Sequence, residues 1–376
     1  MTDQKIVSYL LRVVSGEIKG FSAGLILGLL SLLEGVYWAF ATLGRRLTSP
    51  KRLPMPVISV GNLVAGGTGK TPCVIWLVRE LKKAGFNPAI LTRGYGGTVS
   101  EQGMVVRHGD LERISPGIIG DEPYLLAKLL PETAVGVGRD RLTMGLRILR
   151  EVSRVDCFIL DDGFQYWKLK REFDLVLLEA SNPFGYGHLI PRGTLREPVH
   201  GLKRAGAILI TRTEQVDGER LSGVIQGLNR QFPTIPCQPA RQTITRIIPL
   251  SDYGSEGAGL EAGSFLKGRL VAAVTGIGNP GQFFDTVEKA GANLDFSKAY
   301  PDHYGWTPSD IHELGAILRS KGIRDIMITA KDGVKLKEFS AIFREQGLEF
   351  YIMNLEFEVH DPEILNRITE SIRDWC

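Results

Sequence analysis

The chain has 376 residues, of which 43% are hydrophobic, and its formal net charge at pH 7 is +3. This length favours two domains, and the small net charge excludes a strongly basic nucleic-acid-binding protein. The four cysteines form no C-x-x-C pair, which indicates a reducing compartment and no structural metal.

Residues 21–43 form an unusually apolar stretch, long enough for a membrane span of roughly 20 residues. Glu34 lies in its middle, where a charge is costly in lipid, and basic residues flank both ends. We therefore expect a helix, or a bent pair of helices, lying in the cytosolic face of a membrane, with Tyr37 and Trp38 at the interface. A single span, a buried core helix and a secretory signal are the alternatives.

A glycine-rich segment, V-I-S-V-G-N-L-V-A-G-G-T-G-K-T, covers residues 57–71. A buried strand over 57–60 and a helix over 71–83 flank it, which is the context of a phosphate-binding P-loop. The strict motif has glycine where this chain has Val64. Lys70 would reach the β- and γ-phosphates, and the Thr71 hydroxyl would bind Mg²⁺. The backbone of Gly66, Gly67, Thr68 and Gly69 would surround the nucleotide phosphates. An ordinary glycine-rich turn is the alternative.

Short apolar strands alternate with helices after this segment. Strands are expected over 88–92, 134–137, 157–160, 174–179 and 207–211, with helices over 124–130 and up to about residue 151. Residues 101–115 form an excursion for which we expect a small hairpin. The pattern predicts a P-loop NTPase-like, doubly wound parallel sheet whose functional loops lie at the carboxyl ends of the strands.

Three candidate groups follow these strands. Asp161 and Asp162 end an apolar strand, as the Mg²⁺-binding carboxylate of a Walker B motif does. Asp121 stands at a predicted helix N-cap, so capping alone is its alternative role. The Gly- and Pro-rich segment 183–198 is too long for an inert connection, and Arg196 in it is a candidate phosphate clamp. A solvated loop is the alternative there.

A second, smaller α/β domain is expected from about residue 238. Strands are predicted over 243–249, 269–275, 325–329 and 350–355, and helices up to residue 290 and over 308–320 and 361–374. The predicted division is therefore a membrane-associated segment (1–50), a P-loop domain (51–237) and a lid-like domain (238–376).

Several motifs together resemble one family, the tetraacyldisaccharide 4′-kinases of lipid A biosynthesis. They are G-N-L-V-A-G-G-T-G-K-T-P (61–72), T-R-G-Y-G (92–96), G-D-E-P (120–123), G-R-D-R (138–141), L-D-D-G-F-Q (160–165), L-R-E-P (195–198), P-D-H (301–303) and T-A-K-D (329–332). Val64 agrees with this family. Tyr166 and the Ala of T-A-K-D depart from its usual His and Glu.

The resemblance implies transfer of the γ-phosphate of ATP, with Mg²⁺, to the 4′-hydroxyl of a tetraacylated glucosamine disaccharide 1-phosphate. It also implies a location at the cytoplasmic face of the bacterial inner membrane, monotopic or single-span. The implied partners are the membrane lipid substrate and the membrane surface, with no nucleic acid and no obligate protein.

The resemblance assigns roles to particular residues. Asp121 would accept the proton of the sugar hydroxyl, and His303 would orient Asp121 or share that proton, a capping or surface histidine being the alternative. Lys70 and Arg196 would act on the phosphates, and Glu197 would lie near ATP. The metal ligands would be Thr71, Asp161, Asp162 and Glu122. The disaccharide and its 1-phosphate would be held by Arg93, Tyr95, Arg139, Arg141 and Gln165.

Competing hypotheses come from other classes. A P-loop NTPase acting as a membrane-associated switch or assembly factor would hydrolyse or bind nucleotide without phosphorylating an acceptor. A soluble small-molecule kinase or ligase would not explain the apolar character of residues 21–43.

Overall fold

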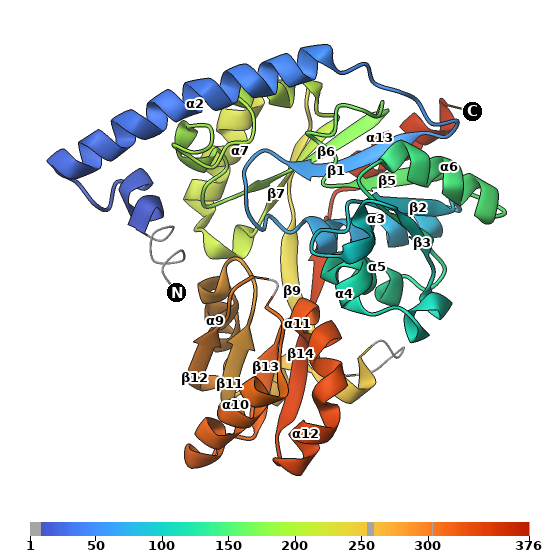
Figure 1. Ribbon diagram of the computed structural model, residues 1–376. Helices are drawn as coiled ribbons and strands as arrows, with labels where there is room; N and C mark the ends of the chain where they lie inside the picture. The colour runs from blue at the N-terminus through green and yellow to red at the C-terminus, as the bar shows by residue number, and fades with distance from the viewer. Residues whose placement is uncertain (1–8, 254–258, 303, 376) are drawn as a thin grey trace. The chain divides into compact units, whose positions relative to one another are not determined.

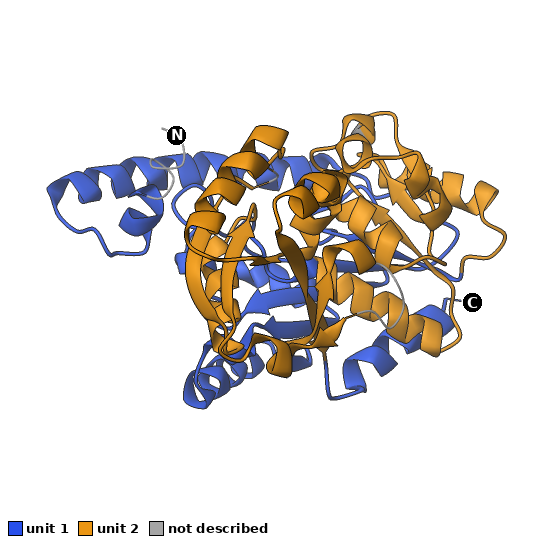
Figure 2. Ribbon diagram, turned by 90° about the horizontal axis from the view of Figure 1, so that it is seen from below, with its two compact units in different colours: residues 1–70, 156–241, 359–376 blue, residues 71–155, 242–358 orange. Residues whose placement is uncertain are grey.

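The computed structural model describes residues 9–253, 259–302 and 304–375 (Figure 1). The chain divides into two compact units, which Figure 2 colours separately. Unit 1 comprises residues 1–70, 156–241 and 359–376, and unit 2 comprises residues 71–155 and 242–358. The three-domain division expected from the sequence stays a prediction.

Unit 1 contains a parallel sheet in the strand order β5-β1-β6-β7-β8, with all neighbours parallel. All six residues of β1 are buried, as expected for a strand in the interior of a parallel sheet. The strands predicted in this region are confirmed. The elements are α2 (Phe21–Leu47), β1 (Val57–Asn62), β5 (Cys157–Asp161), β6 (Phe173–Glu179), β7 (Ala207–Thr211), α7 (Gly218–Gln231), β8 (Cys237–Pro239) and α13 (Glu363–Arg373).

The core of unit 1 packs one face of β6 and β7 against α7. Val176 and Leu178 of β6 and Ile208 and Ile210 of β7 are two residues apart, so they point to the same side of the sheet. Leu228 of α7 covers them. Apolar side chains of the 183–198 segment and of the phosphate loop also belong to this core. The 183–198 segment, which has no regular secondary structure predicted, is therefore held in place by its buried side chains.

Helix α2 is one continuous helix (Figure 1). Most of its residues are exposed. Only Ala23 and Leu30 of its 27 residues are buried. It is long and apolar enough to cross a membrane. The alternative of a buried core helix is therefore wrong, while the choice between an interfacial helix and a single span stays a prediction.

The first part of unit 2 has the strand order β3-β4-β2, where β2 and β4 are parallel and β3 is antiparallel to β4. The hairpin expected within 101–115 is wrong, because β3 lies in that segment and takes β4 as its partner. The helix predicted over 71–83 is confirmed as α3, in which Val74, Leu77, Val78 and Leu81 are buried. The elements are α3 (Lys70–Lys83, beginning in unit 1), β2 (Pro88–Thr92), β3 (Met104–Val106), α4 (Pro116–Ile119), α5 (Asp121–Leu129), β4 (Val135–Val137) and α6 (Arg141–Glu151).

The second part of unit 2 is built on a six-stranded sheet in the order β10-β9-β14-β13-β11-β12. The pairs β13–β14, β11–β13 and β11–β12 are parallel, and β10 is antiparallel to β9. The elements are β9 (Arg241–Pro249), β10 (Leu260–Glu261), α8 (Ala262–Leu266), β11 (Leu270–Thr275), α9 (Pro280–Lys289), β12 (Asn293–Ala299), α10 (Pro308–Ser320), β13 (Asp325–Ile328), α11 (Ala330–Leu336), α12 (Ser340–Glu345) and β14 (Glu349–Glu358).

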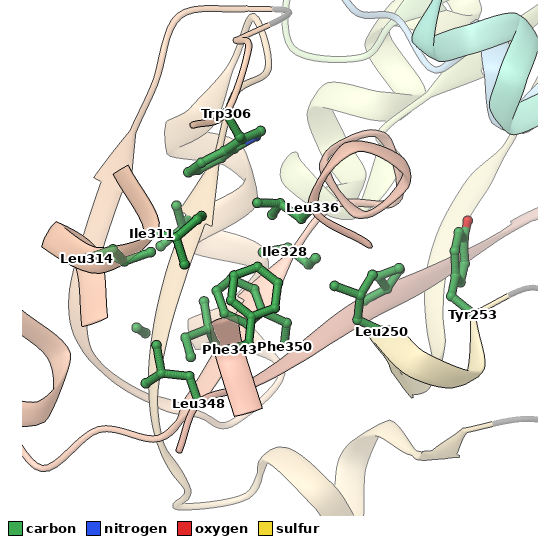
Figure 3. Close-up of a cluster of buried hydrophobic side chains, with 14 of the residues drawn as sticks. Leu250, Tyr253, Trp306, Ile311, Leu314, Ile328, Leu336, Phe343, Leu348 and Phe350 are labelled. Atoms are coloured by element: carbon green, nitrogen blue, oxygen red, sulfur yellow. The ribbon is translucent and has the colours of Figure 1, made fainter. Parts of the chain in front are cut away.

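A buried apolar cluster packs α10, α11 and α12 against one face of this sheet (Figure 3). Phe343 of α12 stacks on Phe350 of β14, with ring centroids 3.9 Å apart. Trp306 packs against Tyr300, with ring centroids 4.4 Å apart, and Leu336 places α11 in the same cluster. This packing fixes α11, which carries two lysines of the candidate site.

Candidate functional site

The turn between β1 and α3 has the form of a phosphate-binding loop. Gly66 and Gly69 have φ angles of 124° and 85°, which residues other than glycine rarely adopt. The side-chain amide of Asn62 donates to the Val64 carbonyl at 2.7 Å, and the Thr211 hydroxyl donates to the Thr68 carbonyl at 3.0 Å. Gly66 and Gly67 stay exposed at the tip, so their backbone is accessible to an anionic ligand.

Val64, which stands where the strict P-loop motif has glycine, has a structural role. The Val64 side chain is 5% exposed and belongs to the unit 1 core. Val64 also forms an antiparallel bridge with Leu195, and the backbone bonds on either side are Ala65 N–H to Thr194 O at 2.7 Å and Arg196 N–H to Leu63 O at 2.9 Å. The 183–198 segment is therefore hydrogen-bonded directly to the phosphate loop.

Three charged side chains meet beside the loop. Lys70 Nζ lies 3.4 Å from Asp162 Oδ1, and Arg196 Nη1 donates to the same carboxylate at 2.9 Å. Burial alone would raise the pKa of Asp162, but the charges and hydrogen bonds of Lys70 and Arg196 outweigh it and lower the pKa. Asp162 also has a left-handed φ of 51°. Guanidinium and ammonium groups so arranged are suited to binding phosphate oxygens.

A second layer supports Arg196. Gln165 Oε1 accepts from Arg196 Nη1 at 3.4 Å, and Gln165 Nε2 donates to Glu197 Oε1 at 2.8 Å. Both oxygens of Glu197 accept from Arg204, at 2.6 and 2.7 Å. Glu197 is 8% exposed, so it is a buried, paired carboxylate. Arg204 and Gln165 thereby fix the segment that carries Arg196.

The loop suits an anionic phosphate ligand with a divalent cation. Thr68 Oγ1 is buried and has no hydrogen-bond partner among the described residues, so it is a donor for such a ligand. Asp161 ends β5 with 3% of its surface exposed, and Thr71, the second residue of α3, is 7% exposed. Over the described residues, no three His, Cys, Asp or Glu side chains are grouped as a metal site. Hydroxyl, carboxylate, phosphate and water ligands are the usual set for Mg²⁺ in P-loop proteins.

Unit 2 carries the other acidic candidates, at the start of α5. Gly120 is the N-cap and Asp121 is the first helical residue, which corrects the predicted N-cap role of Asp121. Gly120 has a φ of 96°, and a Cβ there would lie 2.6 Å from the Tyr95 carbonyl oxygen, so only glycine fits. Asp121 thus sits with its carboxylate at the positive end of a helix.

Two lysines of α11 pair with these acids. Lys335 Nζ lies 3.1 Å from Asp121 Oδ2, and 12% of each side chain is exposed. Lys331, one helical turn earlier, donates to Glu122. The sequence interpretation did not single out either lysine as a partner of the acids. The i, i+4 spacing of Lys331 and Lys335 was the available signal, because it places both on one helix face.

Asp332 fixes the start of α11. Its Oδ2 accepts from the hydroxyls of Thr275 at 2.8 Å and Thr329 at 2.6 Å, and its Oδ1 accepts from Gly276 N–H at 3.1 Å. Asp332 is fully buried, and this burial raises its pKa against the opposing effect of those hydrogen bonds. The T-A-K-D motif is thus a structural connection between β11, β13 and α11.

The predicted sugar-binding residues fall into separate groups. Arg93 and Tyr95 are exposed, with 65% of Tyr95 accessible. Arg139 pairs with Glu101 at 3.0 Å on the surface, and Arg141 is 7% exposed and donates to the Arg139 carbonyl. Gln165 lies in unit 1 beside Arg196. His303 lies outside the described residues. The roles of these residues stay predictions.

Some contacts of the phosphate loop and of the 183–198 segment could not be predicted from the sequence. Arg212, with a left-handed φ of 58°, donates to the Gly67 carbonyl and to Glu179 Oε2 at 2.9 Å. Tyr37 and Glu34 of α2 contact the 183–198 segment. These residues stand far from the P-loop in sequence, and no motif joins them to it.

Comparison with known proteins gives one consistent family. Residues 26–373 match the family model described as tetraacyldisaccharide-1-P 4′-kinase. The tetraacyldisaccharide 4′-kinase of Pelobacter propionicus is 36% identical over 329 residues, which covers 88% of this chain and 85% of that protein. That of Halothermothrix orenii is 32% identical over 372 residues and covers 95% of each.

A solved structure agrees with these relatives. The crystal structure of LpxK from Aquifex aeolicus in complex with ATP has a TM-score of 0.71 and 29% sequence identity, and the match covers 92% of this chain and 99% of that one. The predicted P-loop NTPase-like α/β fold is confirmed by this match and by the parallel strands of both units.

Proposed function

Because the chain belongs to the tetraacyldisaccharide 4′-kinase family, we propose that it transfers the γ-phosphoryl group of ATP to the 4′-hydroxyl of a tetraacylated disaccharide 1-phosphate. The observation that carries this proposal is the cluster of Lys70, Asp162 and Arg196 beside an exposed glycine loop. Phosphoryl transfer is accelerated mainly by positioning and by neutralising charge, and this cluster supplies two cations for that purpose.

ATP supplies the phosphoryl group, and Mg²⁺ offsets the negative charge of its phosphates. The amides of residues 66–69, the Thr68 hydroxyl and Lys70 would hold the phosphates. Thr71 with the Asp161–Asp162 pair would hold Mg²⁺, and Glu122 is a further candidate ligand. Arg196 would lie at the γ-phosphate. Its guanidinium, which donates to Asp162 in the structure, would then donate to phosphate oxygens instead, so one charged hydrogen bond would replace another.

Asp121 is proposed as the base. It would accept the proton of the 4′-hydroxyl as the sugar oxygen bonds to the γ-phosphorus and the bond from that phosphorus to the ADP oxygen breaks. The paired Lys335 would keep the Asp121 carboxylate oriented until the hydroxyl arrives. Following the family resemblance, His303 would assist Asp121.

The sugar and its 1-phosphate are assigned to three arginines, a tyrosine and a glutamine. Arg93 and Tyr95 are exposed in the loop after β2, and Arg139 lies on the surface before α6. Arg141 and Gln165 complete the proposed set. A disaccharide with a phosphate group suits guanidinium and amide donors, because these reach both hydroxyl and phosphate oxygens.

We place the enzyme at the cytoplasmic face of the inner membrane, held there by α2. The acyl chains of the substrate stay in the bilayer, so a kinase that acts on its head group gains from being fixed at the surface. Ten large apolar residues of α2, from Phe21 to Leu47, are exposed and suit this location.

The decisive experiment is incubation of the full-length protein with γ-labelled ATP and a panel of lipid A precursors in detergent. We expect label on the 4′-position of the tetraacyldisaccharide 1-phosphate, and none with a Lys70→Met variant. Hydrolysis of ATP without a labelled acceptor would contradict the proposal and favour a nucleotide-dependent switch.

A further inference from the structure

Helix α2 presents two different faces. Its exposed face carries large apolar side chains, among them Leu25, Leu29, Leu32 and Phe40 with 62%, 60%, 69% and 71% of their surface accessible. A second face carries Ser31, Glu34 and Tyr37, spaced three residues apart, so they lie along one side of the helix. All three contact the same segment, residues 188–196.

The contacts of Glu34 use both carboxylate oxygens. Glu34 Oε1 accepts from the backbone N–H of Leu189 at 2.7 Å, and Glu34 Oε2 lies 3.2 Å from His188 Nδ1. Only 19% of the Glu34 side chain is exposed. The charge that seemed costly for a membrane helix is therefore used to hold a loop of the soluble part of the enzyme.

Ser31 and Tyr37 extend this attachment. Ser31 Oγ accepts from Arg192 Nη1 at 2.7 Å. Tyr37 donates its hydroxyl to the Arg196 carbonyl at 2.8 Å. Burial raises the pKa of Tyr37, an effect that the neighbouring Arg196 opposes and Glu197 strengthens, so the phenol remains a donor at neutral pH.

The held segment continues into the phosphate loop. Arg196 N–H donates to Leu63 O, and the Arg196 guanidinium binds Asp162, which in turn pairs with Lys70. A path of direct contacts thus runs from α2 through the backbone of Arg196 to the lysine of the P-loop.

We propose that Ser31, Glu34 and Tyr37 are positioning residues of the nucleotide site, which hold segment 188–196 against the phosphate loop and thereby set the place of the Arg196 guanidinium. The inference rests on the proposed function, in which Arg196 binds the γ-phosphate. It gives α2 a role in positioning Arg196, in addition to its proposed role in membrane attachment.

The test measures ATP affinity of the full-length protein in detergent micelles, where no bilayer and no lipid substrate is needed. Tyr37→Phe removes one hydrogen bond and should raise the Kd for ATP about fivefold. Glu34→Ala should raise it roughly tenfold or more, and Glu34→Gln, which keeps an acceptor for Leu189 N–H, should lie between wild type and Glu34→Ala.

A matched serine pair serves as control. Ser31→Ala loses the acceptor for Arg192, whereas Ser22→Ala changes an exposed hydroxyl in the first turn of the same helix. We expect a raised Kd only for Ser31→Ala. Thermal unfolding of every variant shows that it is folded, and a drop in Tm with an unchanged Kd for ATP would overturn the inference in favour of a merely structural contact.

A double-mutant cycle identifies the route. Because Tyr37 is proposed to act through Arg196, Tyr37→Phe should have no further effect on the Kd in an Arg196→Ala background. Additive effects would overturn the inference. If Arg196→Ala alone leaves the Kd for ATP unchanged, the inference fails, because Arg196 is then not part of the nucleotide site. The acceptor-labelling experiment decides the kinase activity separately.

Discussion

The ammonium of Lys335 lies 3.1 Å from a carboxylate oxygen of Asp121, and both side chains are nearly buried. A cation so close to the carboxylate restricts the rotamers of the Asp121 side chain. An ion pair with Lys335 therefore connects the candidate base to helix α11 of unit 2.

Replacing Lys335 tests this pairing. Lys335→Met should lower kcat about tenfold or more with little change in the KM for ATP, because the base loses its orienting charge. Lys335→Arg should retain most of the activity. Lys321→Met, which breaks the exposed pair with Asp295, is the control and should change kcat less than about twofold. Steady-state kinetics with the lipid acceptor measure each, and equal effects at the two lysines would contradict the assignment.

Asp121 itself should be indispensable to the chemical step. Asp121→Asn keeps the size of the side chain and its place in the helix but cannot take a proton, so kcat should fall by roughly 10²–10⁴-fold. The Kd for ATP should stay near that of the wild type. A variant with nearly normal kcat would remove Asp121 as the base.

The pKa of Asp162, lowered by Lys70 and Arg196, has a consequence for stability. A carboxyl with a lowered folded-state pKa stabilises the fold above the ordinary Asp pKa of about 3.9, and this contribution is lost as pH falls through the lowered value. In Asp162→Asn the free energy of unfolding should therefore be lower than in wild type at neutral pH, with the difference narrowing below about pH 4.

Asparagine is the informative replacement at this position. Asn tolerates the left-handed φ of 51° as Asp does, so the variant tests the charge without adding backbone strain. Urea unfolding at several pH values measures the effect, with Asp295→Asn on the surface as control. A difference that stays constant from neutral to strongly acidic pH would argue against the charge interaction.

Asp332 should matter for stability more than its size suggests. Asp332→Ala leaves two hydroxyls and the Gly276 N–H without their acceptor in a fully buried place, which should cost about 3 kcal/mol of unfolding free energy. Asp295→Ala should cost less than about 1 kcal/mol, because its ion pair is exposed. Denaturant unfolding compares the two variants, and similar losses would contradict the structural role of Asp332.

The apolar face of α2 should set the membrane affinity. Replacing Leu25, Leu29 and Phe40 together by Gln should reduce binding to phosphatidylethanolamine–phosphatidylglycerol vesicles by at least tenfold, since each buried side chain of this kind contributes about 1.5–3 kcal/mol. Vesicle sedimentation measures the bound fraction. Unchanged sedimentation would refute α2 as the membrane attachment.

Much of the fold was predictable because its strands are dense in buried apolar residues. The runs that became β1, β2 and β7 are entirely buried, and their bounds follow the apolar pattern closely. Strand β12 was missed, since it alternates between half-buried and exposed residues and is rich in polar side chains at the edge of its sheet. Helix α7 was missed as well, because Gly223 and Gly227 interrupt its apolar pattern.

The candidate site was predictable only where it is local in sequence. Lys70, Asp161 and Asp162 stand in motifs with a fixed relation to strands, so the fold class alone brings them near a nucleotide. The pairs Lys335–Asp121 and Tyr37–Arg196 join residues more than a hundred positions apart. Such contacts depend on which surfaces pack together, and hydrophobic periodicity does not encode this.

The double face of α2 bears on how this enzyme is prepared. Deleting residues up to 43 to improve solubility would remove Glu34 and Tyr37 together with the exposed apolar side chains of α2. By the positioning role proposed for these two residues, inhibitors selected against such a shortened protein would meet an altered nucleotide site. Exchanging only the outward-facing leucines and phenylalanines for hydrophilic residues would give a tractable protein that still recognises nucleotide as the natural enzyme does.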